Sequence, residues 1–147
     1  MLSATGLSYR YREGGRDHVL FQDVDLALAA GERVALLGAS GCGKSTLLNL
    51  LGTIDSPHSG SIRIGDTEVA GLGEPERTLV RRRWLGFVYQ RFLLVPTLTG
   101  AENVQLPLDL LSVAAAEARE RVHAGLAAVG LAERAETFPD RLSGGEQ

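Results

Sequence analysis

The stretch that decides the fold is Gly38-Ala39-Ser40-Gly41-Cys42-Gly43-Lys44-Ser45-Thr46. Its spacing, a glycine, four residues, then Gly-Lys and a hydroxyl, is that of a phosphate-binding loop. Before it, Val34-Ala35-Leu36-Leu37 is typical of a buried parallel strand, and after it, residues 47–51 are typical of a buried helix. Strand, glycine loop and helix form the context that this motif requires.

The residue types of this loop suit an anion. Glycines keep the backbone open for close approach by phosphate oxygens and tolerate positive φ. Unpaired amides at the start of the following helix, together with its dipole, favour negative charge. Lys44 adds a point charge for the β- and γ-phosphates, and Ser45 offers a hydroxyl to Mg²⁺. We therefore predict nucleotide phosphate binding rather than a glycine-rich turn with an accidental lysine.

Length and composition narrow the class of protein. The chain has 147 residues, the length of one domain, and a net charge of −3 with 22% charged residues. A chain with this small negative net charge lacks the excess of positive charge that nucleic-acid binding requires. A single cysteine excludes an internal disulfide, and no apolar run reaches the length of a membrane span or a signal peptide. We expect a cytosolic, soluble chain.

The first ninety residues are expected to be mixed α/β. Outside the phosphate loop and its flanks, we predict strands over 1–12, 19–29, 61–64 and 85–89 and a helix over 75–83. Cations at a helix C-terminus oppose its dipole favourably, so Arg81-Arg82-Arg83 is interpreted as a solvated face rather than a nucleic-acid patch.

Past Gln90 the character of the sequence changes. Residues 91–100 are apolar and interrupted by Pro96, which indicates a loop that docks on a partner. A helical part follows over about 95–140. Within it, residues 112–136 predict a helical hairpin broken around Gly130, with Val122, Leu126 and Val129 on one buried face.

The last six residues, Leu142-Ser143-Gly144-Gly145-Glu146-Gln147, suggest a second anion site. Ser143 with Glu146 three places on fits a capping box, which by itself indicates only a helix start. Two glycines in the first turn weaken a helix by roughly 1 kcal/mol each, but they clear the backbone for a ligand. This site is separated from Lys44 by about a hundred residues, so the two could meet on one nucleotide across a two-fold dimer.

The phosphate loop, Gln90 after a strand, and the terminal signature together resemble the ATP-binding (ATPase) subunit of ABC transporters. Residues 85–90, 93–99, 102–104 and 106–108 are similar to its lipoprotein-releasing and macrolide-export branch. The resemblance implies an α/β fold: a P-loop NTPase core with an antiparallel β subdomain and an inserted helical subdomain. It divides a single domain into 1–90, 91–141 and the signature at 142–147, with the C-terminal third of the fold beyond these residues.

The resemblance also implies roles for matching residues. Residues 38–46 would bind ATP, with Lys44 and Gln90 as the catalytic residues and Ser45 and Gln90 as Mg²⁺ ligands. Tyr11 would stack on adenine; Tyr9 is the rival, and a plain strand aromatic is the alternative for either. The signature residues that would hold the ATP of the opposite subunit are Ser143, Gly144, Gly145, Glu146 and Gln147. Implied partners are a second ATPase subunit, homodimeric in the simplest case, and a transmembrane permease at the cytoplasmic face of the membrane, with neither nucleic acid nor direct membrane insertion.

The sequence departs from the family in one respect. Members continue into an apolar strand ending in Asp-Glu and then a switch histidine; in 1–147 neither Asp66 nor Asp109 follows such a strand, and every histidine precedes the signature. We therefore expect these residues alone to bind ATP without hydrolysing it and to expose apolar surface over the first helix. Two other classes, a small-molecule kinase and a soluble ABC-type ATPase acting on DNA or ribosomes, fit the signature and the docking loop less well.

Overall fold

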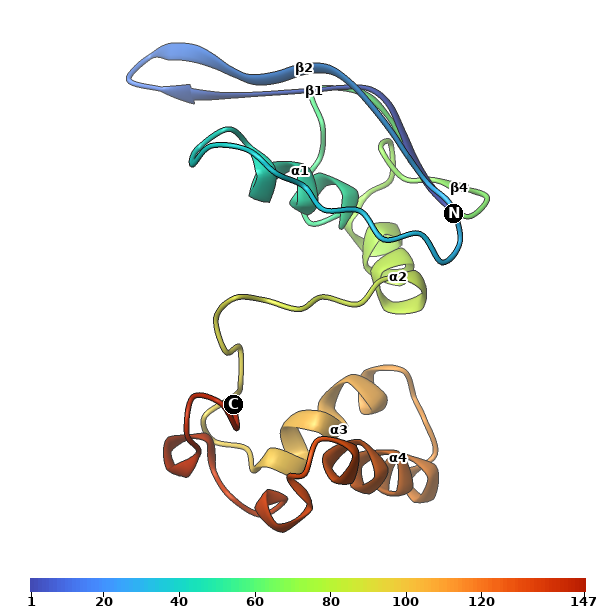
Figure 1. Ribbon diagram of the computed structural model, residues 1–147. Helices are drawn as coiled ribbons and strands as arrows, with labels where there is room; N and C mark the ends of the chain where they lie inside the picture. Colours follow the sequence, from blue (N-terminus) through green and yellow to red (C-terminus); the bar gives the residue numbers. More distant parts are fainter. The chain divides into compact units, whose positions relative to one another are not determined.

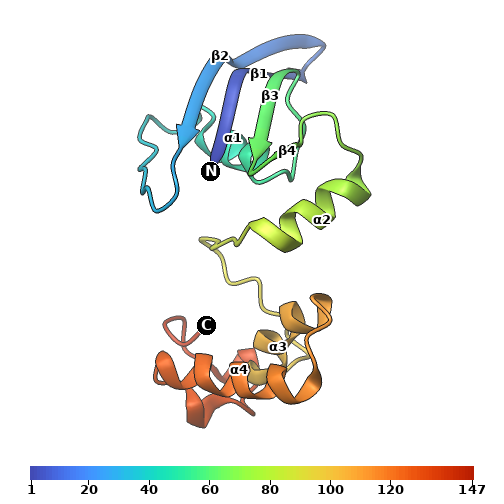
Figure 2. The same ribbon diagram turned by 90° about the vertical axis from the view of Figure 1, so that its right-hand side faces the viewer.

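The computed structural model describes residues 1–147 and divides them into two compact units, Met1–Gly86 and Phe87–Gln147. Figures 1 and 2 label their elements. The first unit contains every strand and the phosphate loop, and the second is helical. The sequence-based division into 1–90, 91–141 and 142–147 stays a prediction.

The first unit is built on one antiparallel sheet. Its strands are β1 (Leu2–Glu13), β2 (Arg16–Leu28), β3 (Ser59–Ile64) and β4 (Thr67–Glu68), in the order β2-β1-β3-β4. The β1–β2 hairpin turns at Gly14 and Gly15, whose φ values of 57° and 80° suit a two-residue turn that needs positive φ at both positions. The strands predicted over 1–12, 19–29 and 61–64 are confirmed.

One face of this sheet packs on α1 (Lys44–Leu51), as the ribbon shows (Figures 1 and 2). The buried residues are Ala4, Leu7, Leu47, Leu50, Leu51, Ile62, Ile64, Val69 and Val80. Leu7, Leu50 and Ile62 are almost completely buried at its centre. Leu48 is 57% exposed on α1, in agreement with the apolar surface expected over the first helix.

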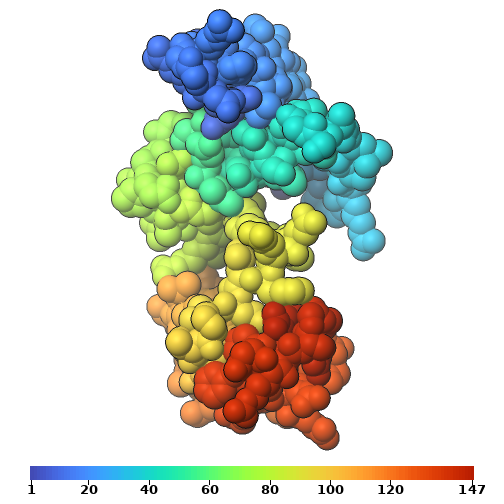
Figure 3. Space-filling view, turned by 90° about the vertical axis from the view of Figure 1, so that its left-hand side faces the viewer, coloured from blue at the N-terminus to red at the C-terminus, as the bar shows by residue number.

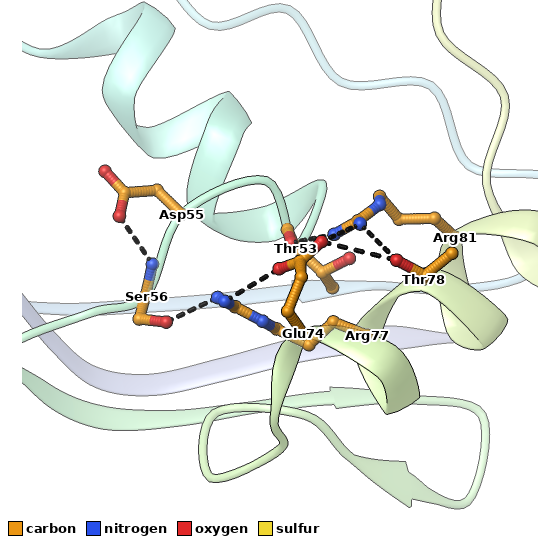
Figure 4. A network of polar contacts seen from close by, with 7 residues as sticks. All are labelled: Thr53, Asp55, Ser56, Glu74, Arg77, Thr78 and Arg81. Atoms are coloured by element: carbon orange, nitrogen blue, oxygen red, sulfur yellow. Dashed lines mark hydrogen bonds and ion pairs between the residues drawn. The ribbon is translucent and has the colours of Figure 1, made fainter.

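The helix α2 (Glu74–Trp84) is tied to the end of α1 by polar contacts (Figure 4). Arg81 donates to the Thr53 carbonyl at 2.6 Å, and Arg77 donates to the Ser56 hydroxyl. Both guanidinium groups pair with Glu74, and the bond from Arg81 is the largest cause of a pKa of Glu74 below its usual value. The solvated-face interpretation is therefore wrong for Arg81, which has packed inward.

Two predicted buried strands are absent, and both predictions are wrong. Residues 34–37 and 85–89 form no strand, and Leu37 and Val88 are 87% and 103% exposed. A buried parallel strand requires hydrogen-bonded neighbours on its two sides. The one sheet in this structure consists of β1–β4, so neither segment has a ladder to join.

The second unit consists of α3 (Gly100–Leu110), α4 (Ala115–Ala128) and two short 3₁₀ turns, η1 (Ala132–Arg134) and η2 (Pro139–Arg141). The sequence placed a helical part here but no helix at 100–110. On α4, Val122 and Leu126 are buried as predicted. Val129 is 69% exposed, a correction, because α4 ends just before it and its backbone is no longer helical.

The predicted docking segment is held from one side by Asn103. Its amide nitrogen donates to the carbonyls of Val95, Leu98 and Thr99 at 3.0–3.1 Å, and its amide oxygen accepts from the Val95 amide at 2.7 Å. Phe92, earlier in the same segment, is 56% exposed. In Figure 3 the chain from about residue 85 to 100 is yellow. None of the helices has the length and apolar character needed to cross a membrane.

Candidate functional site

The phosphate loop turns sharply into α1 at two glycines. Gly41 has φ 79° and Gly43, the residue before the helix, has φ 96°, both in the region that side chains disfavour. No side chain caps the amides of the first helical turn. Because a helix N-terminus leaves its first amides unpaired and carries positive dipole charge, this end of α1 is open to an anion.

Gly43 is fixed by packing as well as by conformation. A Cβ built on Gly43 would lie 2.8 Å from Leu20 Cγ and 3.1 Å from Phe21 Cδ1, both on β2. A separation of 2.8 Å is shorter than real Cβ contacts, so a side chain here would force either the Leu20 side chain or the loop to move. The hairpin and the loop therefore touch through a glycine.

Lys44 folds its side chain back over the loop. Its Nζ donates to the carbonyls of Gly38 at 2.8 Å and Ala39 at 2.6 Å. It also lies 3.7 Å from Cys42 Sγ. An ammonium has three donors and no acceptor, so the group both closes the loop and places a positive charge at its mouth.

A pocket of about 610 Å³ opens beside this loop, within the range of small-molecule sites. It is lined by Tyr9, Tyr11, Leu20, Ser40, Gly41, Gly43, Lys44, Ser45 and Thr46. The lining contains one cation and no carboxylate, so its charge suits an anionic ligand. The structure thus brings Tyr11, predicted from the family resemblance, to the same pocket as the loop residues.

The two candidate tyrosines differ in their surroundings. Tyr11 is 42% exposed, and its ring stacks on His18 with centroids 5.3 Å apart. Tyr9 is half-buried and donates its hydroxyl to Asp55 Oδ2 at 2.8 Å, which with burial raises the pKa of Tyr9. Its ring also stacks on Phe21. Tyr11 therefore keeps more free ring surface for a base, and Tyr9 is part of the pocket wall.

Sequence reasoning missed two features of this wall. Leu20 lines the pocket and meets Gly43, but no sequence pattern pairs a hairpin residue with the loop. Asp55, which accepts the Tyr9 hydroxyl, lies in the loop after α1, and no sequence pattern pairs that loop with β1. Tyr9, named from the sequence as the rival of Tyr11, lines the same pocket, as expected for two residues on one face of a strand.

The signature forms a separate polar cluster in the second unit. The Glu146 carboxylate accepts from the Ser143 amide at 2.8 Å and from the Ser143 hydroxyl at 2.7 Å. Arg134 donates to its other oxygen at 3.0 Å. These bonds hold the pKa of Glu146 below its usual value, the Ser143 amide contributing most. The reciprocal bond of a capping box, from the Glu146 amide to the Ser143 hydroxyl, is not made.

The remaining predicted site residues are placed as follows. Ser45 lies in the first turn of α1 and lines the pocket. Gly144 and Gly145 are exposed, and Gln147 donates to the carbonyls of Pro139 and Leu142. Gln90 is exposed in a segment without regular structure that belongs to the second unit. The roles of Gln90 and the signature toward a phosphate group therefore stay predictions.

Residues 21–147 match the family described as ABC transporter. The chain is 48% identical over its full length to the lipoprotein-releasing system ATP-binding protein LolD of Pseudomonas syringae pv. tomato, and covers 65% of that protein. It is 46% identical to the macrolide export ATP-binding/permease protein MacB of Burkholderia thailandensis, covering 22% of it. Both branches predicted from the sequence are therefore confirmed as relatives.

A solved structure of an ATP-binding cassette has the same fold. The ATP-binding cassette MJ0796, a dimer in a post-hydrolysis state bound to ADP and Pi, superposes with a TM-score of 0.91 at 35% identity. The match covers 99% of this chain and 65% of that one, so the chain spans less than two thirds of both the cassette and the LolD relative. The predicted fold class is confirmed, and residues 1–147 belong to the ABC transporter family.

Proposed function

We propose that this chain is the ATP-binding part of an ABC transporter and couples ATP binding and hydrolysis in a dimer to export or extraction by a membrane partner. The observation that carries the proposal is the position of Lys44, whose ammonium lies over a glycine loop beside a pocket without carboxylates. Triphosphate would take the loop amides and the ammonium, and Tyr11 would stack on the base.

Mg²⁺ is the second proposed ligand, and the residues present fit it in part. Ser45 supplies a hydroxyl oxygen at the pocket wall, and such an oxygen next to phosphates suits this hard cation. The family resemblance implies Gln90, which lies in the second unit, as a further ligand. Bound there, Mg²⁺ would neutralise charge on the β- and γ-phosphates. In this proposal Lys44 orients the phosphates and Gln90 positions the attacking water.

The general base for hydrolysis is proposed to come from outside residues 1–147. A water that attacks the γ-phosphate needs an oriented acceptor, and no Asp or Glu lines the pocket. Residues 1–147 by themselves would then bind ATP without turnover, which is the alternative function. The two proposed functions can be separated by measuring phosphate release from ATP. If the base lies outside residues 1–147, the complete protein should release phosphate and residues 1–147 alone should not.

The proposed partners are a second ATPase subunit and a membrane permease. They are inferred from the relatives and from two surfaces, the signature at 143–145 and the segment 91–100. The MJ0796 cassette is dimeric, and Ser143, Gly144 and Gly145 offer a hydroxyl and exposed backbone that would hold the γ-phosphate of the opposite subunit. The segment 91–100 presents Phe92 and Leu93, both more than half exposed, to a membrane permease. The chain would accordingly work at the cytoplasmic face of the membrane.

The test is nucleotide binding by variants of the complete protein that contains these residues, with the non-hydrolysable analogue AMP-PNP in calorimetry. Lys44 is the only lysine of the chain, so the matched control is an exposed arginine of the same unit. Lys44→Ala should weaken binding roughly 10- to 100-fold, the range of a hydrogen bond to a charged group, whereas Arg82→Ala should change it less than about twofold.

A second arm tests the metal. Ser45→Ala should weaken binding in the presence of Mg²⁺ but leave binding in EDTA unchanged. Unchanged affinity in Lys44→Ala would refute the phosphate site, and equal losses with and without Mg²⁺ in Ser45→Ala would refute the metal ligand.

A further inference from the structure

A polar chain runs from α2 to the wall of the nucleotide pocket. Arg77 of α2 donates to the Ser56 hydroxyl, and the Ser56 amide donates to Asp55 Oδ1 at 2.7 Å (Figure 4). The other oxygen of the same carboxylate accepts from the Tyr9 hydroxyl at 2.8 Å. Tyr9 lines the pocket next to the phosphate loop. One carboxylate therefore connects the pocket wall to the body of the unit.

Asp55 is itself held in place. Its amide and that of Ile54 both donate to the Asn49 carbonyl near the end of α1, at 3.3 and 2.9 Å. The same α1 begins at the phosphate loop. The carboxylate that binds Tyr9 is thus fixed to the helix whose N-terminus would face the phosphates. The Tyr9 ring is therefore held in place by α1 as well as by its own strand, β1.

The Tyr9 ring is restrained on its sides as well as at its hydroxyl. It stacks on Phe21 with centroids 6.2 Å apart and an interplanar angle of 29°, and meets His58 edge-on at 6.1 Å. Along β1, Leu7 is completely buried, Tyr9 is half-buried and Tyr11 is exposed on the same face. Tyr9 therefore lies between the core and the residue proposed to stack on the base.

We infer that Tyr9 is a nucleoside-binding wall of the ATP site and that Asp55 is its positioning residue. The inference rests on the proposed function, since it assumes that the pocket takes a nucleotide. Tyr9 would contact the sugar or base, whereas Lys44 and the loop amides would take the phosphates. Affinity for the nucleoside half would then depend on the Asp55–Tyr9 bond, and affinity for the phosphate half would not.

Two ligands separate these halves, and both are measured on the complete protein. AMP-PNP carries the nucleoside and the phosphates, and inorganic tripolyphosphate carries the phosphates alone. Tyr9→Ala should weaken AMP-PNP about tenfold, the scale of one lost aromatic contact to a nucleoside, and leave tripolyphosphate within about twofold. Tyr9→Phe and Asp55→Ala should each weaken AMP-PNP about threefold, because each removes only the exposed hydrogen bond that positions the ring and leaves the ring itself in place.

The double variant and a network control complete the design. Tyr9→Phe combined with Asp55→Ala should be no weaker than Asp55→Ala alone, because both changes remove the same bond. Ser56→Ala breaks the contact with Arg77 and keeps the backbone bond to Asp55, so its ratio of AMP-PNP to tripolyphosphate affinity should equal that of the wild type.

The outcomes are distinguishable. A wild type that binds neither ligand overturns the proposed function. A wild type that binds both ligands, together with unchanged affinity for each of them in Tyr9→Ala, overturns only the present inference. Equal losses for the two ligands in Tyr9→Ala also overturn it, since a general loosening of the fold acts on both. Selective loss of AMP-PNP supports it.

Discussion

Replacing Gly43 by alanine tests whether the hairpin and the phosphate loop are packed as the structure shows. Gly43 has φ 96°, and its added Cβ would lie 2.8 Å from Leu20 Cγ, 3.0 Å from Leu20 Cδ2 and 3.1 Å from Phe21 Cδ1. Two separate penalties result, one from the backbone conformation and one from the contact with β2.

The magnitudes of these penalties can be assigned separately. Holding an L-residue in the left-handed region costs about 1–2 kcal/mol. Forcing a methyl group into a packed site costs about 1–3 kcal/mol more. Gly41→Ala supplies the matched control, because Gly41 has φ 79° and its added Cβ meets nothing within 4 Å. Gly41→Ala should therefore carry the first penalty only, and the two variants should differ by about 1–3 kcal/mol.

Thermal unfolding of the complete protein is the assay. For a domain of about 150–250 residues, a loss of 1 kcal/mol in unfolding free energy lowers the midpoint by about 2–4 °C. Gly43→Ala should therefore melt about 2–12 °C below Gly41→Ala. Equal midpoints for the two variants would show that β2 does not pack on the loop, and would refute the contact. A partial recovery in Gly43→Ala with Leu20→Ala would identify Leu20 as the clashing group.

Two further predictions concern the second unit. Asn103→Ala removes four hydrogen bonds to residues 95–99 and should speed amide hydrogen exchange at Val95 and its neighbours. Asn103→Asp keeps the acceptor for the Val95 amide and should show a smaller effect. Unchanged exchange in Asn103→Ala would show that Asn103 does not hold this segment. The Ser143 amide lowers the pKa of Glu146 from its ordinary 4.5, so its charge stabilises the fold above that value and the benefit is lost as pH falls through the folded pKa. The midpoint difference between the wild type and Glu146→Gln should therefore stay constant above about pH 5 and shrink toward pH 3, and a difference that grows in acid would reverse the assigned sign.

The phosphate loop was predictable because its signal is local. Glycines at fixed positions, one lysine and one hydroxyl determine the turn, the helix start and the charge without reference to distant residues. The start of α3 had a local signal that went unused, because Thr99 and Glu102 form a complete capping box. Pro107 lies inside this helix and cannot donate to the carbonyl of Asn103 four residues earlier, so residue type alone argued against a helix there.

The strands at 34–37 and 85–89 were not predictable in the same way. Apolar runs indicate burial, but a strand exists only as part of a hydrogen-bonded ladder, and the neighbours of a ladder are set by the whole fold. The prediction that Val129 is buried was wrong for a related reason, because a local pattern does not show where an element ends. Its spacing fits a helical face, but the helix ends before it, so periodicity alone extended the face too far.

The proposed nucleotide site consists of two structural parts that have different sequence requirements. The phosphate half is a loop and a helix N-terminus, which any glycine-rich turn of the right spacing can form. The nucleoside half depends on β1 and β2, whose pairing shifts register near Leu7 and Tyr9. The halves meet where Gly43 approaches Leu20 and where Asp55, anchored to α1, binds Tyr9. Substitutions at these two contacts should therefore change how well one nucleotide spans both halves, even where each half alone is unaltered.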